Sequence, residues 1–406
     1  MNAQEIRRWL RETDPRRLDA LWASADQARR RHVGDEVHLR ALIEISSHCV
    51  RQCGYCGLRA PRADLARYRM TAEEVLECVA TAGQLGFGTV VLQAGEDPAL
   101  SRDWVCDLVR RIRSAAPALA VTLSLGERTL EELRAWKDAG ADRYLLRFET
   151  SNRDLYDRIH PPLPGRRSDR LAILRSLRAL GYEVGSGVMV GIPGQTYVDL
   201  AKDIQWFAAL DLDMIGVGPF IAHPDTPLGN GDWLHSRRSE NGACPHSPED
   251  AENGAENGDE NGASPRFPAS PRFPNQVPAT EEMTYKVLAL ARLACPRANI
   301  PSTTALATLN RDSGRERGLL RGANVVMPNL TPTKYRRLYD IYPNKVCVTE
   351  SPADCGPCLG RRIEALGRKV GAGRGDSPRK AFRAAQTAAP SAAGPLSRRE
   401  THWKEL

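Results

Sequence analysis

The stretch ALIEISSHCVRQCGYCGLR, at residues 41–59, joins a short apolar run to a loop that carries three cysteines. The run ALIEIS (41–46) has the apolar, β-branched character of a buried strand. Cys49, Cys53 and Cys56 follow in the loop. In parallel α/β folds, the residues that carry chemistry stand at the carboxyl ends of strands. The stretch therefore predicts a parallel sheet in which one strand ends in a reactive loop.

The same alternation continues along the chain. Helical stretches with apolar faces separate further β-rich runs, and several begin at capping residues such as Thr71, Thr129 and Thr280. Near-continuous apolar strands that alternate with helices predict a parallel sheet covered by helices. Eight such units predict an α/β fold of the closed (β/α)8 TIM barrel type, with an open doubly wound sheet as the alternative. The seven further runs are TVVLQ (89–93), LAVTLS (119–124), RYLLRF (143–148), VGSGVMV (184–190), MIGVGPF (214–220), ANIPST (298–303) and NVVMP (324–328).

Polar residues accompany the end of each run, and a closed barrel would bring them to one rim. Gly95 and Glu96 follow the second run, and Ser124 ends the third. Arg147 and Glu149 stand at the end of the fourth. The other groups are Gly191 to Thr196 after the fifth run, Pro219 to Pro224 after the sixth, Thr303 and Thr304 after the seventh, and Asn329 after the eighth.

Length and composition divide the chain into a barrel and less regular parts. The 406 residues, 41% of them hydrophobic, are enough for one large barrel, which we assign to residues 37–370. Residues 1–36, rich in Arg and Ala, predict a helical extension that covers the bottom of the barrel. Residues 235–278 carry Asn-Gly and Pro repeats without an apolar period and predict a disordered insertion. Residues 371–406 predict a disordered basic tail.

The net charge of +7 does not indicate a nucleic-acid partner. Residues 371–406 hold seven Lys and Arg against three Asp and Glu, so four of the seven charges lie there and the body is close to neutral. Aromatic residues are few and do not alternate with a basic stripe. No apolar run approaches the roughly 20 residues of a membrane span, and the first residues are charged. We expect a cytoplasmic protein that binds neither nucleic acid nor membrane.

Ten cysteines without a secretion signal indicate thiols that are kept reduced for ligation or catalysis. A structural zinc site needs four ligands, and the loop offers three unless His48 or a distant thiol completes the set. A [4Fe–4S] cluster held by three cysteines leaves one iron without a protein ligand. S-adenosylmethionine can chelate that iron, and its reductive cleavage yields a 5′-deoxyadenosyl radical. We predict this radical site, with zinc or an unmetallated thiol loop as the alternatives.

The loop, taken with Gly95 and Glu96, resembles the radical S-adenosylmethionine superfamily, in which a Gly-Gly-Glu-like stretch holds the methionine amino group. Ala94 here replaces the first of those glycines. Between residues 36 and 370, segments such as VLQAGEDP, GADRYLLRFET, GYEVGSGVMVGIPGQT and YRRLYDIYPNKVC resemble the HydE family of [FeFe]-hydrogenase maturases, relatives of biotin synthase and methylornithine synthase. The resemblance implies an enzyme with a [4Fe–4S] cluster, S-adenosylmethionine and an internal cavity.

Individual roles follow from the resemblance. It implies that Ser124, Arg147, Glu149 and Arg170 hold S-adenosylmethionine, although Arg147 and Glu149 alone could form a structural salt bridge. The implied substrate is a cysteine-bound iron carbonyl cyanide complex from a partner maturase, attacked at sulfur by the radical. The implied electron donor is a one-electron reductant such as ferredoxin or flavodoxin. The residues that match the family's substrate cavity are Thr122, Thr303, Thr304, Tyr339 and Tyr342.

A second cysteine group, Cys347, Cys355 and Cys358, predicts an auxiliary second iron–sulfur cluster near the barrel surface. Zinc with an outside ligand, or a redox pair at Cys355 and Cys358, are the alternatives. Biotin synthase is disfavoured because Cys78 and Cys106 fall in predicted helices, and methylornithine synthase gives no reason for the second group. A non-catalytic iron–sulfur scaffold would not need the residues that match an S-adenosylmethionine clamp.

Overall fold

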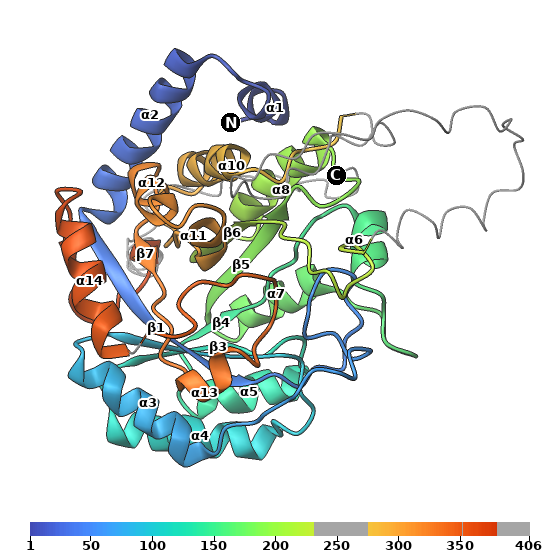
Figure 1. Cartoon of the computed structure of the whole chain (residues 1–406), viewed down its shortest axis with the longest axis vertical. Helices are drawn as coiled ribbons and strands as arrows, with labels where there is room; N and C mark the ends of the chain where they lie inside the picture. The colour runs from blue at the N-terminus through green and yellow to red at the C-terminus, as the bar shows by residue number, and fades with distance from the viewer. Residues whose placement is uncertain (231–274, 351, 380–406) are drawn as a thin grey trace, which may run out of the picture.

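The computed structural model describes residues 1–230, 275–350 and 352–379, and it shows a curved sheet whose strands are all parallel (Figure 1). The strand order is β6-β5-β4-β3-β2-β1-β7, with β8 beside β1. This order confirms the predicted α/β barrel. The strands are β1 (Glu36–Ser46), β2 (Thr89–Ala94), β3 (Ala120–Ser124), β4 (Arg143–Leu145), β5 (Glu183–Val190), β6 (Met214–Pro219), β7 (Val325–Val326) and β8 (Lys369–Val370).

Helices cover the outside of the sheet and begin where the sequence predicts. Thr71 and Thr129 form complete capping boxes, and the Thr280 side chain accepts a hydrogen bond from the Met283 amide. The helices of this layer are α3 (Ala72–Gln84), α4 (Arg102–Ala115), α5 (Leu130–Asp138), α6 (Arg153–Ile159), α7 (Arg170–Ala179), α8 (Tyr197–Ala209), α10 (Glu281–Ala294), α11 (Thr304–Leu309), α12 (Gly314–Leu320), α13 (Thr333–Arg336) and α14 (Pro352–Glu364).

The seventh predicted strand, residues 298–303, is not formed. Two isolated parallel bridges replace it, one between Met214 and Asn299 and the other between Pro301 and Val325. Pro301 has no N–H to donate to a ladder, which explains why the run does not continue as a strand. The bridges still link β6 to β7, so the ring closes at this point through single contacts.

The N-terminal extension is helical, as predicted, but lies elsewhere than expected. Its helices are α1 (Ala3–Leu10) and α2 (Pro15–Val33). They pack mainly against α8 and α10 of the outer layer. The bottom of the barrel is instead covered by residues from the far end of the described chain.

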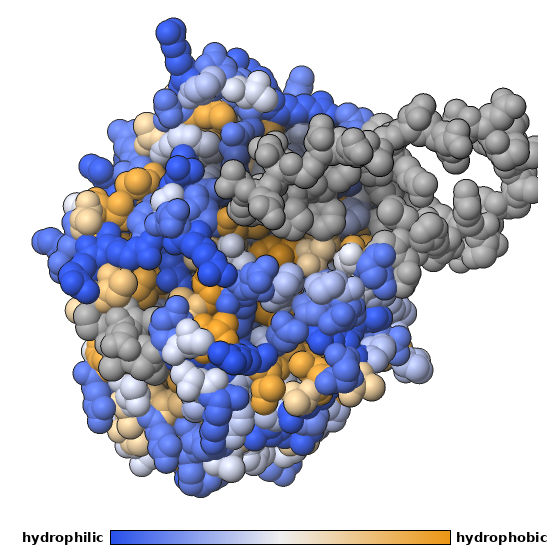
Figure 2. Space-filling model, viewed as in Figure 1, coloured by the Kyte–Doolittle hydropathy of each residue, from blue (hydrophilic) through white to orange (hydrophobic). Residues whose placement is uncertain are grey.

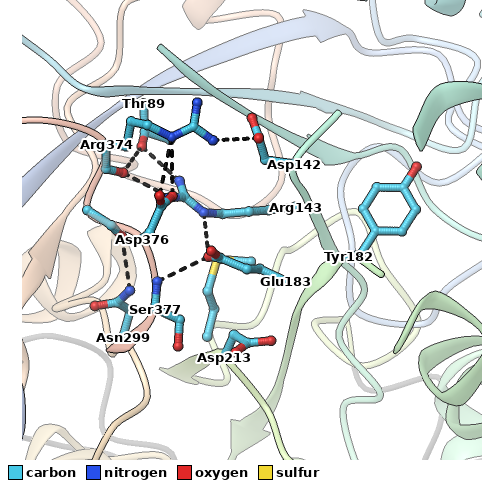
Figure 3. A network of polar contacts seen from close by, with 12 residues as sticks. Thr89, Asp142, Arg143, Tyr182, Glu183, Asp213, Asn299, Arg374, Asp376 and Ser377 are labelled. Atoms are coloured by element: carbon cyan, nitrogen blue, oxygen red, sulfur yellow. Dashed lines mark hydrogen bonds and ion pairs between the residues drawn. The ribbon is translucent and has the colours of Figure 1, made fainter. Parts of the chain in front are cut away.

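Residues 371–377, here called the floor segment, lie across the amino ends of the strands (Figure 3). The carbonyl of Arg374 accepts hydrogen bonds from Thr89 on β2 (2.8 Å) and Arg143 on β4 (2.9 Å). Asp376 pairs with Arg143 (2.5 Å). The floor segment belongs to the region predicted to be a disordered tail, so that prediction was wrong for these residues.

A glycine shows how closely the floor segment fits. A Cβ on Gly88, just before β2, would stand 1.6 Å from the Gly373 carbonyl oxygen. Gly375 is in the left-handed region (φ 56°), and its carbonyl accepts hydrogen bonds from Arg40 and Asn299 (both 3.1 Å). The contacts of the floor segment are therefore polar ones made by its backbone and charged side chains.

The predicted insertion, residues 235–278, falls largely outside the described residues. Its last residues are ordered: Gln276 forms a bridge with Thr196, and Val277 is buried. The face of the molecule in Figure 2 is largely hydrophilic, with hydrophobic residues in small groups among charged ones. No helix of the described residues is long and apolar enough to span a bilayer.

Candidate active site

A cavity of about 370 Å³ lies inside the barrel. The three-cysteine loop lines it at the rim, and Arg40, which contacts the floor segment, lines it toward the bottom. Parallel strands that all point one way bring the loops after them to this rim. The predicted residues that the structure gathers in the wall are Gly95, Glu96, Thr122, Ser124, Arg147, Glu149, Arg170, Thr303, Thr304, Tyr339, Tyr342 and Cys347.

Backbone hydrogen bonds fix the three-cysteine loop on the rim. The Gly54 amide donates to the Ile159 carbonyl (2.7 Å), and the Gly57 amide donates to the Ile341 carbonyl (3.1 Å). These partners come from distant parts of the chain. The loop is therefore held in place by the finished barrel.

The three thiols face one buried site. Burial raises the pKa of Cys56 to about 12, with a further contribution from Cys49, and it raises the pKa of Cys53 well above its usual range. Such thiols ionise readily only when a cation takes the place of the proton. Among the described residues, no three His, Cys, Asp or Glu side chains are grouped as ligands of a single ion. Three thiols in one cavity wall are the donor set of a cluster that takes one thiolate on each of three irons.

Gly95 allows the loop to pack against the end of β2. A Cβ at this position would stand 2.2 Å from the His48 carbonyl oxygen and 2.8 Å from Cys49 Cβ. Only glycine leaves room for that approach. The Ala that replaces the preceding glycine of the superfamily pattern, Ala94, is part of β2 and lines the cavity without such a restriction.

We expect Gly95→Ala to reduce the iron that the protein binds on anaerobic reconstitution. The new methyl group must push the loop away, at a cost of about 1–3 kcal/mol. Bound iron and inorganic sulfide per chain would measure the effect. Gly83→Ala on α3 is the matched control, because a Cβ at Gly83 meets no atom within 4 Å. Equal iron contents in the two variants would contradict the packing argument.

Arg147 and Glu149 stand together after β4. Arg147 pairs with Glu149 (3.1 Å) and donates to the Val188 carbonyl (2.5 Å). Glu149 has a left-handed backbone (φ 63°), which is unusual for a residue with a side chain and turns its carboxylate toward the cavity wall. The salt bridge between Arg147 and Glu149, which the sequence analysis kept as an alternative, is thus present. Both side chains also line the cavity, so the bridge leaves them accessible to a ligand.

Arg170 begins α7 and is held on three sides. Its Nε donates to Glu127 (2.9 Å), and its Nη1 donates to the Arg147 carbonyl (2.6 Å). Its Nη2 contacts His160 Nε2 (2.5 Å). The guanidinium therefore has a fixed plane at the cavity wall. Sequence reasoning did not identify Glu127 or His160.

Glu44 and Lys345 form a buried ion pair in the cavity wall (2.9 Å). Asn329 donates a further hydrogen bond to Glu44 (2.9 Å). Burial raises the pKa of Glu44, although Lys345 acts in the opposite direction. Glu44 is the one charged residue in ALIEIS, and this exception to an apolar strand is the sign by which the sequence could have revealed it.

The second cysteine group is spread between cavity and surface. Cys347 lines the cavity and accepts a contact from Arg315 (3.4 Å), whereas Cys358 on α14 is exposed. Cys355 has no described side chain. The expectation of a site close to the surface therefore fits Cys358 better than Cys347.

The sequence and the fold of this chain are similar to those of known proteins. The radical SAM superfamily model matches residues 43–207. The structure of methylornithine synthase (PylB) aligns with a TM-score of 0.72 and 23% identity over 94% of this chain and 96% of that one. The structure of HydG, a maturase of the [FeFe]-hydrogenase, aligns with a TM-score of 0.66 and 18% identity over 91% and 71%. The two structures show that the fold is shared. The superfamily match, together with the sequence relative described next, defines a radical S-adenosylmethionine enzyme.

The sequence narrows the class. The chain is 44% identical to the [FeFe] hydrogenase maturase subunit HydE of Thermotoga maritima over 356 residues. This alignment covers 87% of each of the two chains. The chain belongs to the HydE family of [FeFe]-hydrogenase maturases. It is thus an enzyme that uses a [4Fe–4S] cluster and S-adenosylmethionine, and the family relationship supports an additional iron–sulfur cluster.

Proposed function

We propose that this maturase directs a 5′-deoxyadenosyl radical onto the sulfur of a small anionic iron complex, a cysteinate carbonyl cyanide species. A partner maturase of the HydG type would supply the complex, and a ferredoxin or flavodoxin would supply the electron. We expect the reaction to take place in the cytoplasm, where thiols stay reduced. The observation that carries the proposal is the charge of the cavity.

The cavity wall contains cationic and hydroxyl side chains with single atoms that have no hydrogen-bond partner among the described residues. Arg40 Nε, Arg315 Nε and Thr122 Oγ1 are buried and make no hydrogen bond. Neither arginine pairs with a carboxylate in the described part of the chain. Burial, with Arg143 nearby, lowers the pKa of Arg40 to about 9. An anionic ligand would offset the free-energy cost of burying these unpaired charges and would accept hydrogen bonds from the free donor atoms.

The upper part of the cavity suits S-adenosylmethionine. The arginine side chains of Arg147 and Arg170 can bind its carboxylate, and Glu149 can accept hydrogen bonds from ribose hydroxyls. Tyr55 packs with Met189 and Phe220 in a separate apolar cluster beside the thiols, where an adenine ring would find an apolar surface.

Cys49, Cys53 and Cys56 would hold the cluster, which when bound would supply the electron for cleavage of the C–S bond of S-adenosylmethionine. The chain's own contribution is position and exclusion of water. The floor segment closes the bottom of the barrel below Arg40. Tyr339 and Tyr342 line the wall, and the Tyr339 hydroxyl accepts a hydrogen bond from Gln93 on β2 (3.2 Å). A radical made at the rim would therefore meet an enclosed substrate, which suppresses side reactions.

The related chemistries fit less well. A biotin synthase would need additional thiols in the barrel for a sacrificial cluster. Cys78 on α3 and Cys106 on α4 are buried between helices and sheet, and neither lines the cavity. Cys347 does line the cavity, next to Arg315, which distinguishes this chain from a plain methylornithine synthase barrel.

The test is the fate of the adenosyl group. Reconstituted protein would be reduced with S-adenosylmethionine and a synthetic iron cysteinate carbonyl cyanide complex, deuterated at the cysteine Cβ. Attack at sulfur forms a bond between C5′ and sulfur and leaves the remaining electron on the iron of the complex, which is reduced by one electron. Mass spectrometry should then find the adenosyl group attached to sulfur. Recovery of only 5′-deoxyadenosine that carries deuterium would show hydrogen abstraction instead. No cleavage of S-adenosylmethionine at all would favour the scaffold.

A further inference from the structure

One carboxylate, that of Glu127, lies between the three-cysteine loop and Arg170. Glu127 follows β3, is 2% exposed and does not line the cavity. Its Oε2 pairs with Arg51 (2.8 Å), the residue between Cys49 and Cys53. Its Oε1 accepts from Arg170 (2.9 Å) and from Ser168. The residue thus contacts both halves of the proposed site without reaching the ligand.

The partners of Glu127 form a ring whose hydrogen-bond directions are determined by Arg170. Arginine only donates, so His160 Nε2 must accept and its Nδ1 carries the proton. His160 then donates to Tyr156 (3.1 Å), and Ser168 donates to Glu127. The Tyr156 hydroxyl can donate to Ser168 (2.8 Å) or directly to Glu127 (3.3 Å). Burial, helped by the charge of Arg170, lowers the pKa of His160 to about 2, so the ring is stable at neutral pH with an uncharged imidazole.

The ring leaves part of Arg170 free for a ligand. A guanidinium has five N–H groups, and Arg170 uses one on Glu127, one on the Arg147 carbonyl and one on His160. The other two belong to Nη1 and Nη2, and Arg170 lines the cavity. A carboxylate is bound best by two parallel N–H groups in a fixed plane.

The two arginines beside Glu127 also require that it be a charged carboxylate. Arg51 and Arg170 are buried with two carboxylates, Glu96 and Glu127, and Arg51 pairs with both (2.8 Å each). A neutral glutamine at position 127 would turn its oxygen to one arginine and its NH₂ group to the other. One guanidinium would then face a donor instead of an acceptor.

We propose that Glu127 is a positioning residue that holds Arg170 ready for the carboxylate of S-adenosylmethionine and, through Arg51, holds the three-cysteine loop. The inference rests on the proposed binding role of Arg170. It assigns Glu127 no contact with substrate or cofactor. Its effect should therefore be confined to the amino-acid arm of S-adenosylmethionine and to the retention of the cluster.

The experiment compares two ligands on anaerobically reconstituted protein. S-adenosylmethionine carries the amino-acid arm, and 5′-methylthioadenosine lacks it. Glu127→Gln should weaken binding of S-adenosylmethionine about ten- to a hundredfold, the scale of a hydrogen bond to a charged group, and change binding of methylthioadenosine less than about twofold. Glu131→Gln is the matched control, because the Glu131 side chain is 74% exposed and pairs with Arg102 at the surface.

At equal cluster content, the double variant Glu127→Gln with Arg170→Gln should bind S-adenosylmethionine no more weakly than Arg170→Gln alone, because Glu127 acts on the amino-acid arm through Arg170. A chelator should also remove iron several-fold faster from Glu127→Gln than from Arg170→Gln, because only Glu127 also holds Arg51. If Glu127→Gln does not fold, Glu127→Asp keeps the charge and should show the same selective loss in smaller degree.

Equal weakening of both ligands, additive losses in the double variant, or no loss at all would overturn the role of Glu127. These outcomes differ from a failure of the proposed function. In that case the unmodified protein would itself bind S-adenosylmethionine no better than methylthioadenosine, or Arg170→Gln would leave its affinity unchanged.

Discussion

Cys53→Ala should abolish reductive cleavage of S-adenosylmethionine, with a loss of about three orders of magnitude or more. Cys53 is the middle cysteine of the loop and is buried. Two remaining thiols cannot hold three corners of a cluster, so the electron has no carrier. The electron paramagnetic resonance signal of the reduced cluster, which in the parent should change on addition of S-adenosylmethionine, should be absent.

Cys78→Ala provides the control for this prediction. Cys78 is also buried, but it packs on α3 within the core and does not line the cavity. Its variant should retain iron, the spectral change and 5′-deoxyadenosine formation, which liquid chromatography would quantify. Cleavage that survives in Cys53→Ala would remove the three-cysteine loop from the mechanism.

Lys345→Met should lower the free energy of unfolding by about 3–5 kcal/mol, because it leaves Glu44 buried without its counter-charge. The two side chains are 7% and 2% exposed. Lys334→Met is the matched control, because Lys334 is 64% exposed and its pair with Glu74 is a surface pair worth at most about 1 kcal/mol. Anaerobic urea unfolding would measure both.

The loss in Lys345→Met should also depend on pH. The folded pKa of Glu44 is already raised by burial, and removal of Lys345 raises it further. When the pKa of Glu44 is higher in the folded protein than in the unfolded chain, the unfolded chain loses the proton at a lower pH. The free energy of unfolding therefore falls as the pH rises above the pKa of Glu44 in the unfolded chain. The deficit should therefore be larger at pH 8 than at pH 5. Glu44→Gln added to Lys345→Met should recover most of it, and a persistent deficit would contradict the ion-pair explanation.

The sheet was predictable where strands are buried on both faces, because burial leaves continuous apolar runs such as TVVLQ (89–93). It was not predictable at residues 298–303, where Pro301 interrupts an equally apolar run. The run has the composition of a strand, but the hydrogen bonds that a strand needs depend on the neighbours that the folded chain supplies. Those neighbours cannot be read from one segment.

The candidate site divides in the same way. Side chains that lie close together in the chain, such as Cys49, Cys53 and Cys56, could be brought into one predicted site from their spacing. Glu127 could not, because its partners Ser168 and Arg170 are 41 and 43 residues away and belong to no local pattern. The contacts of the floor segment could not be predicted from its composition of Gly, Ala and Ser. Such a composition shows that a segment can bury little apolar surface, but it does not show how many backbone hydrogen bonds the segment can make.

The floor segment also determines when the reaction chamber is complete. Residues 371–377 are synthesised after every strand of the barrel, yet they bind Thr89 on β2, Arg143 on β4 and Glu183 on β5. On the ribosome, the barrel therefore has an open bottom until residues 371–377 have been synthesised and can bind to it. A truncation or fusion made at residue 370 would leave the bottom open for the lifetime of the protein.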